Sequence, residues 1–147
     1  MVDVTTANRP TLLLVDDDKN QLELRALVLK MLGFTVLTAA GPAEAISLVA
    51  EHFRPHLDLA ILDYDMPMMN GCVLADYLRE YYPGLKVIVH SGAVHVPETT
   101  SDSVNSFVAK GEGVTQLLAQ ISALLGQAEA TPRAVSLDGW LNVAGSP

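Results

Sequence analysis

Hydrophobic and polar positions divide the chain into short apolar runs and longer segments of helical periodicity. The apolar and β-branched runs predict five strands, at residues 11–15, 35–39, 57–62, 86–90 and 106–109. Apolar residues at helical spacing, bounded by glycine or proline, predict four helices, at residues 20–32, 42–53, 72–81 and 113–125. The alternation of strand and helix therefore indicates an α/β fold.

The same spacing predicts which face of each helix is buried. The expected apolar face of the first helix consists of Leu24, Leu27, Val28, Met31 and Leu32, and that of the third consists of Leu74, Tyr77, Leu78 and Tyr81. Each crossover between parallel strands returns over the sheet and is nearly always right-handed. We therefore expect a doubly wound, five-stranded parallel sheet with helices on both faces.

Composition limits the number of domains and the classes of partner. The 147 residues are 50% hydrophobic and 18% charged, which suits one domain at residues 10–126 between an arm at 1–9 and a tail at 127–147. A formal charge of −8 disfavours binding to nucleic acid or to an anionic membrane, and Arg133 is the only basic residue of the tail. We therefore expect a protein partner, with no DNA or membrane binding.

Two further absences in the sequence indicate the compartment. Cys72 is the only cysteine, so the chain cannot form an internal disulfide, and its first ten residues lack the apolar stretch of a signal peptide. No apolar run reaches the roughly 18 residues of a membrane-spanning helix. A cytoplasmic protein is expected.

Carboxylates follow two of the predicted buried strands. Asp16, Asp17 and Asp18 come directly after the first strand, and Asp63 comes directly after the third, with Asp65 two residues later. Open α/β sheets hold their ligands at the carboxyl ends of their strands, where these acids would gather and repel one another unless a cation intervened. The pattern predicts a Mg²⁺ site in which one carboxylate remains able to accept a phosphoryl group.

Further residues stand at the ends of the later strands, and the whole set resembles a family. The chain resembles a response regulator receiver domain through Asp16-Asp17, Asp63 before Met66-Pro67 and Gly71, Ser91, and Phe107 with Lys110. The resemblance implies a flavodoxin-like receiver fold with strand order 2-1-3-4-5. It also implies a signalling protein of a two-component pathway. Such a protein is not an enzyme: it catalyses only its own phosphorylation and dephosphorylation.

The resemblance assigns expected roles to individual residues. Asp63 would take the phosphoryl group from a sensor histidine kinase or a phosphotransfer protein. The Mg²⁺ ligands would be Asp16, Asp17, Asp63 and the backbone carbonyl of Asp65. Ser91 and Lys110 would bind the phosphoryl group, Lys110 pairing with Asp63 at rest, and Phe107 would report phosphorylation. The signal would then pass to an unidentified downstream protein by contact.

The sequence also departs from the receiver pattern. Only 19 residues separate Ser91 from Lys110, and residues 92–103 lack helical periodicity, so we expect the fourth helix to be shortened or replaced by loop. Gly111 stands where the family has a proline after a cis peptide bond, so a trans Lys110–Gly111 bond is expected. Asp65 and Ala93 occupy positions that tune the loss of the phosphoryl group.

Simpler interpretations apply to several residues. Asp18 is expected to cap the first helix, and Cys72 is an ordinary small residue at a helix start. His90 and His95 are expected to have no role, and Phe107 is equally consistent with a core aromatic. The apolar stretch at residues 135–141 of the tail either docks on a protein surface or is disordered.

Two other functions stay open. A pseudo-receiver would bind a partner without phosphorylation, which the shortened region and Gly111 favour. A haloacid dehalogenase-like phosphatase would use Asp63 and Asp65 as nucleophile and acid-base pair, but those enzymes place further acids downstream rather than upstream. The acids at Asp16 and Asp17 therefore favour the receiver.

Overall fold

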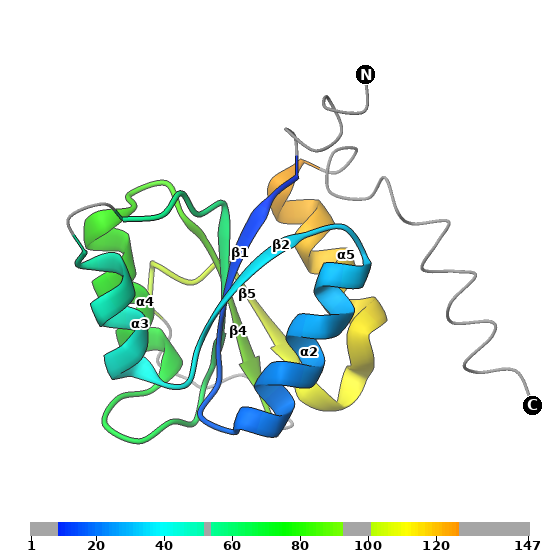
Figure 1. The fold of residues 1–147 in the computed structure, drawn as a ribbon, viewed down its shortest axis with the longest axis horizontal. Helices are drawn as coiled ribbons and strands as arrows, with labels where there is room; N and C mark the ends of the chain where they lie inside the picture. The colour runs from blue at the N-terminus through cyan, green and yellow to red at the C-terminus, as the bar shows by residue number, and fades with distance from the viewer. Residues whose placement is uncertain (1–8, 52–53, 93–100, 127–147) are drawn as a thin grey trace, which may run out of the picture.

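A five-stranded parallel sheet forms the centre of the protein, in the order β2-β1-β3-β4-β5 (Figure 1). The computed structural model describes residues 9–51, 54–92 and 101–126. The strands are β1 (Thr11–Val15), β2 (Thr35–Ala39), β3 (Leu59–Asp63), β4 (Lys86–Ser91) and β5 (Ser106–Ala109). The helices are α2 (Lys19–Met31), α3 (Pro42–Val49), α4 (Gly71–Tyr81), the 3-10 turn η1 (Lys110–Glu112) and α5 (Gly113–Leu125). The predicted fold class and strand order are confirmed.

Some predicted boundaries were wrong. Helix α3 ends at Val49 rather than at residue 53, and Phe53 lies outside the described residues. Strand β3 begins at Leu59 rather than at residue 57, and it includes Asp63 as its last residue. Between β4 and β5, residues 92 and 101–105 contain no helix, whereas Ala93, His95 and the rest of 93–100 lie outside the description, as does the tail at 127–147.

Two hydrophobic cores lie on the two faces of the sheet. Helices α2 and α5 cover one face, and α3 and α4 cover the other (Figure 1). Alternate residues of one strand belong to different cores, because successive side chains point to opposite faces: Leu14 packs with α2 and α5, whereas Leu13 packs with α3 and α4. Burial on both faces explains why the strands read as continuous apolar runs.

The predicted inner face of α2 was only partly right: Leu32 is buried and Val28 packs against the core. Leu24, Leu27 and Met31 are more than half exposed, whereas the buried residues of the helix are Leu22, Ala26 and Leu29. Both sets have helical spacing, so periodicity alone could not separate them. Ala26, a small residue, lies on the buried side and packs in the core beneath the helix. In α4, the expected core residue Tyr77 is likewise exposed, and Ala75 takes an inward position.

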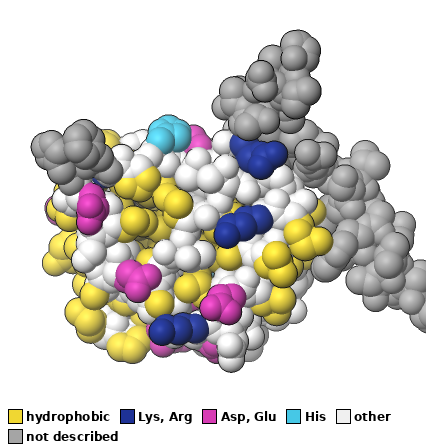
Figure 2. All heavy atoms as spheres, in the orientation of Figure 1, with side chains coloured by type: hydrophobic (Ala, Val, Ile, Leu, Met, Phe, Trp, Pro, Cys, Tyr) yellow, Lys and Arg dark blue, Asp and Glu magenta, His cyan; other side chains and the backbone are white. Residues whose placement is uncertain are grey.

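On the face shown in Figure 2, charged side chains are spread among hydrophobic and neutral ones and form no large patch of one sign. Among the described residues, no helix has the length and apolar character needed to span a bilayer.

Strand register brings the functional candidates to one edge. Val15 is paired with Leu62 across β1 and β3, Asp63 with His90 across β3 and β4, and Ser91 with Ala109 across β4 and β5. All strands are parallel, so the residues that end or follow them meet at the same edge of the sheet. Three of those residues, Asp16, Asp63 and Lys110, build the site described next.

Candidate functional site

Three strands of the sheet, β1, β3 and β5, deliver the site's charged groups. Asp16 follows β1 directly and is held there by its backbone N–H, which donates to the Ala39 carbonyl at 3.2 Å. Asp63 ends β3, and Lys110 follows β5. Asp16 and Asp63 are only 1% and 5% exposed. Buried carboxylates require compensating partners, because removal from water penalises the charged form.

Lys110 bridges the two buried carboxylates. Its Nζ lies 3.0 Å from Asp63 Oδ1 and 3.2 Å from Asp16 Oδ2. Arg25 of α2 reaches the same Asp16 oxygen, with Nη1 at 3.1 Å. The other Asp16 oxygen, Oδ1, accepts a hydrogen bond from the Asp18 backbone N–H at 2.9 Å. Every described partner of Asp16 is therefore a hydrogen-bond donor.

The carboxylates fit a hard divalent cation. One oxygen each from Asp16, Asp17 and Asp63 lies within 4.8 Å of the others, and Asp17 is exposed to solvent. Mg²⁺ prefers oxygen ligands, keeps several waters, and is typically bound through one or two carboxylates. The two buried carboxylates would supply oxygen ligands, and the solvent-facing side at Asp17 would leave room for the waters that Mg²⁺ keeps.

The two buried acids have opposite pKa shifts. Burial raises the pKa of Asp63 from 3.8 to about 6, with the charge of Asp16 adding to the rise and Lys110 opposing it. Burial also disfavours the charge of Asp16, but the Asp18 amide, Lys110 and Arg25 together outweigh it and lower the Asp16 pKa. Asp16 therefore stays ionised, whereas the charged form of Asp63 is disfavoured by its surroundings.

The loop after Asp63 is held tightly. Asn70 caps α4 by accepting hydrogen bonds from the backbone N–H groups of Cys72 and Val73 at 2.8 and 3.0 Å. Gly71 begins the helix so close to β3 that a Cβ there would lie 2.7 Å from the Asp63 carbonyl oxygen. Met68 has a φ of 77°, a left-handed conformation that costs a non-glycine residue energy.

The other predicted site residues that the structure describes differ in burial. Ser91 is buried at the end of β4, and Phe107 is half-buried against the core under α3 and α4. Asp65 is exposed, and Ala93 lies outside the described residues. The Lys110–Gly111 peptide bond is trans, as expected. Asp18 accepts hydrogen bonds from the Asn20 and Gln21 backbone N–H groups, which confirms it as the cap of α2.

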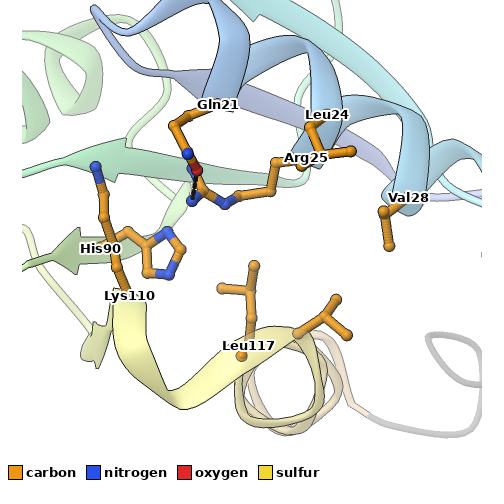
Figure 3. A pocket seen from close by; sticks show the side chains of 9 residues that line it. Gln21, Leu24, Arg25, Val28, His90, Lys110 and Leu117 are labelled. Carbon is orange, nitrogen blue, oxygen red and sulfur yellow. Dashed lines mark hydrogen bonds between the residues drawn. The ribbon is translucent and has the colours of Figure 1, made fainter. Parts of the chain in front are cut away.

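Sequence reasoning missed two residues, Arg25 and His90. His90 was expected to have no role, yet it is 4% exposed and lines a pocket of about 190 Å³ with Arg25 and Lys110, between α2 and α5 (Figure 3). Burial, Arg25 and Lys110 lower the His90 pKa to about 4, so the ring is neutral at pH 7. A signal for Arg25 was its spacing: it lies four residues, about one helical turn, after Gln21, in the second turn of the helix that Asp18 caps.

Comparisons with known proteins agree with this geometry. A family model for the response regulator receiver domain matches residues 12–122. The transcriptional regulatory protein GlrR of Escherichia coli K12 is 35% identical over 102 residues, covering 67% of this chain and 22% of GlrR. The transcriptional regulatory protein PrrA of Mycobacterium bovis is 31% identical over 124 residues, covering 82% of this chain and 52% of PrrA.

A solved structure extends the agreement to three dimensions. The response regulator TrrA of Thermotoga maritima, in complex with Mg²⁺-BeF, superimposes with a TM-score of 0.69 at 28% identity. The match covers 79% of this chain and 99% of TrrA. By contrast, the chain spans between about a fifth and a half of the two curated relatives.

Proposed function

The chain belongs to the response regulator receiver domain family, and from this premise we propose that Asp63 accepts a phosphoryl group from a sensor histidine kinase or a phosphotransfer protein. One observation carries the proposal: Lys110 Nζ lies 3.0 Å from Asp63 Oδ1, beside carboxylate oxygens gathered within 4.8 Å. An ammonium and a cation site together offset the charge that an incoming phosphoryl group brings to a carboxylate. We also propose a cytoplasmic protein, on the composition given above.

The metal ligands are part of the proposal. The carboxylates of Asp16, Asp17 and Asp63 and the backbone carbonyl of Asp65 would hold Mg²⁺. When bound, the ion supplies positive charge beside the phosphoryl oxygens. A cation held there would also favour the ionised, nucleophilic form of Asp63, whose pKa is raised by burial.

The proposed transfer is a simple displacement. A carboxylate oxygen of Asp63 forms a bond to phosphorus while the bond from phosphorus to the donor's imidazole nitrogen breaks, and the nitrogen keeps the electron pair. Lys110 moves from the Asp63 carboxylate to a phosphoryl oxygen, since its ammonium already lies at hydrogen-bond distance. Ser91 ends the adjacent strand and donates its hydroxyl hydrogen to another phosphoryl oxygen.

The consequences of transfer are proposed from the residues around the acceptor. Phe107 is half-buried on the strand that leads to Lys110, so a change at Lys110 reaches it through two residues of backbone. Asp65 and Ala93 tune the attack of water that ends the phosphorylated state. The output is contact with a downstream protein.

Phosphorylation with a small-molecule donor tests the proposal. The full chain is incubated with acetyl phosphate and Mg²⁺, and intact-protein mass spectrometry is followed by mapping of the modified residue. We expect one phosphoryl group on Asp63 that requires Mg²⁺, is lost in Asp63→Asn, and is retained in the matched surface control Asp102→Asn.

The outcomes separate the alternatives. A phosphoryl group on another residue, or none at all, would overturn the proposal, and the latter result with retained folding would favour a pseudo-receiver. Steady turnover of a generic phosphate ester that depends on Asp63 would instead favour a phosphatase.

A further inference from the structure

Asp16 has more cationic partners than one buried carboxylate requires. Its Oδ2 accepts hydrogen bonds from Arg25 Nη1 at 3.1 Å and from Lys110 Nζ at 3.2 Å, while Oδ1 accepts from the Asp18 backbone at 2.9 Å. Asp16 also contributes an oxygen to the carboxylate cluster. A divalent cation at that cluster would lie beside two positive groups that hold the same ligand.

We propose that Arg25 competes with the metal ion for Asp16, and that the guanidinium moves toward His90 when the ion binds. This inference rests on the proposed function, because the metal site belongs to it. Arg25 is a positioning residue in this account: it sets the metal affinity of the resting site without touching the phosphoryl group.

Arg25, rather than Lys110, is the partner that leaves. Lys110 has a second carboxylate, Asp63 at 3.0 Å, and keeps an ion pair after losing Asp16. The other described hydrogen bond of Arg25 goes to a neutral group, from Nη2 to Gln21 Oε1 at 3.0 Å on its own helix. Arg25 also belongs to α2, so its long side chain can turn without moving a strand.

The pocket between α2 and α5 offers the guanidinium a place to go. Arg25 extends from α2 toward the strand ends, and the His90 ring lies opposite it beside Lys110 (Figure 3). The pocket has a volume of about 190 Å³, and apolar side chains such as Val28 and Leu117 form its far wall. A side chain that loses Asp16 therefore needs no rearrangement of the core to enter it.

His90 supplies the acceptor that the moved guanidinium requires. Its Nδ1 is buried and has no hydrogen-bond partner among the residues that the structure describes. A neutral imidazole with its proton on Nε2 presents Nδ1 as an acceptor. Buried polar atoms without a partner are rare in folded proteins. His90 Nδ1 therefore indicates a second position for the Arg25 guanidinium, which lies next to it.

Metal titration of charge variants tests the first half of the proposal. Mg²⁺ binding to the full chain is measured by calorimetry for wild type, Arg25→Met and Arg25→Lys. The control is Lys30→Met, which removes the same charge from an exposed position of the same helix. We expect Arg25→Met to tighten Mg²⁺ binding about tenfold, the scale of one charge-assisted hydrogen bond. Lys30→Met should change it by less than about twofold, because solvent screens an exposed charge.

The second half is tested with His90→Phe, which keeps an aromatic ring and removes the acceptor. This change should weaken Mg²⁺ binding in the wild-type background and have no effect in the Arg25→Met background. As an independent readout, the ¹⁵N resonance of His90 Nδ1 should shift on Mg²⁺ addition in wild type but not in Arg25→Met. Circular dichroism verifies that each variant is folded, and Arg25→Lys, which retains the charge, should bind with intermediate affinity.

Each outcome has a defined meaning. Equal Mg²⁺ affinities for Arg25→Met and Lys30→Met would overturn the competition, and equal effects of His90→Phe in both backgrounds would overturn the role of His90. In either case phosphorylation of Asp63 would still stand. A wild-type chain that binds no Mg²⁺ would overturn the proposed function and this inference together.

Discussion

Replacing the proposed phosphoryl acceptor should stabilise the metal-free protein. Asparagine mimics the protonated form of Asp63, which removes the buried charge and keeps the shape of the side chain. A pKa raised from 3.8 to about 6 means that the folded protein holds the Asp63 proton more tightly than the unfolded chain does. This difference in pKa between the folded and unfolded states corresponds to about 3 kcal/mol of stability, which wild type loses once the pH is well above 6. Asp63 is 5% exposed, so solvent screening reduces this value little.

The sign and the pH window follow from linkage. The favourable contribution of protonated Asp63 is present below pH 3.8 and is lost as the pH rises through about 6. Urea unfolding of wild type and Asp63→Asn in EDTA should therefore differ by about 2–3 kcal/mol near pH 7.5 and converge near pH 4. Mg²⁺ should narrow the difference at the higher pH, because it binds and stabilises the folded wild type.

The matched control is Asp102→Asn, an exposed acid whose replacement should leave the free energy of unfolding nearly unchanged at both pH values. Loss of stability in Asp63→Asn near pH 7.5 in EDTA would refute the reasoning. A gain that is equally large near pH 4 would also refute it, because the effect would not then arise from ionisation.

Three further predictions concern the surroundings of the acceptor. The folded protein keeps the His90 ring neutral, so wild type should lose up to about 3 kcal/mol of stability as the pH falls from 6.5 toward 4. In His90→Phe this loss should be absent, as measured by urea unfolding at several pH values. Gly71→Ala should cost about 1–3 kcal/mol and weaken Mg²⁺ binding, since the new Cβ would lie 2.7 Å from the Asp63 carbonyl oxygen; an unchanged melting temperature would contradict the close approach. Met68→Gly should raise stability by about 1 kcal/mol in the same unfolding assay by relieving a φ of 77°, and a decrease would show that the exposed Met68 side chain matters more.

The positions of Asp16, Asp63 and Lys110 could be predicted because they depend on a short-range signal and a general rule. Strands buried on both faces appear as continuous apolar runs, so their ends are visible in the sequence. Parallel strands then bring all their carboxyl ends to one edge. The predicted strand for Asp63 began two residues early, but its end was close enough to place the carboxylate at that edge.

The rotation of α2 could not be predicted in the same way. Leucines lie on two opposite sides of this helix, so their spacing alone does not show which side is buried. Arg25 borders the buried face of the helix, and its long side chain reaches Asp16 from there. His90 was missed for a related reason: it lies in a run of buried residues, and a sequence does not show that its Nδ1 has no hydrogen-bond partner within the described part of the chain.

Locating the ion in a crystal tests the central claim most directly. Crystals of the full chain are soaked with Mn²⁺, which shares the oxygen preference of Mg²⁺ and whose anomalous scattering marks its position. We predict one peak bound by the carboxylates of Asp16, Asp17 and Asp63, with the Arg25 guanidinium withdrawn from Asp16. A peak that does not involve Asp63, or no peak among these carboxylates at saturating Mn²⁺, would contradict it.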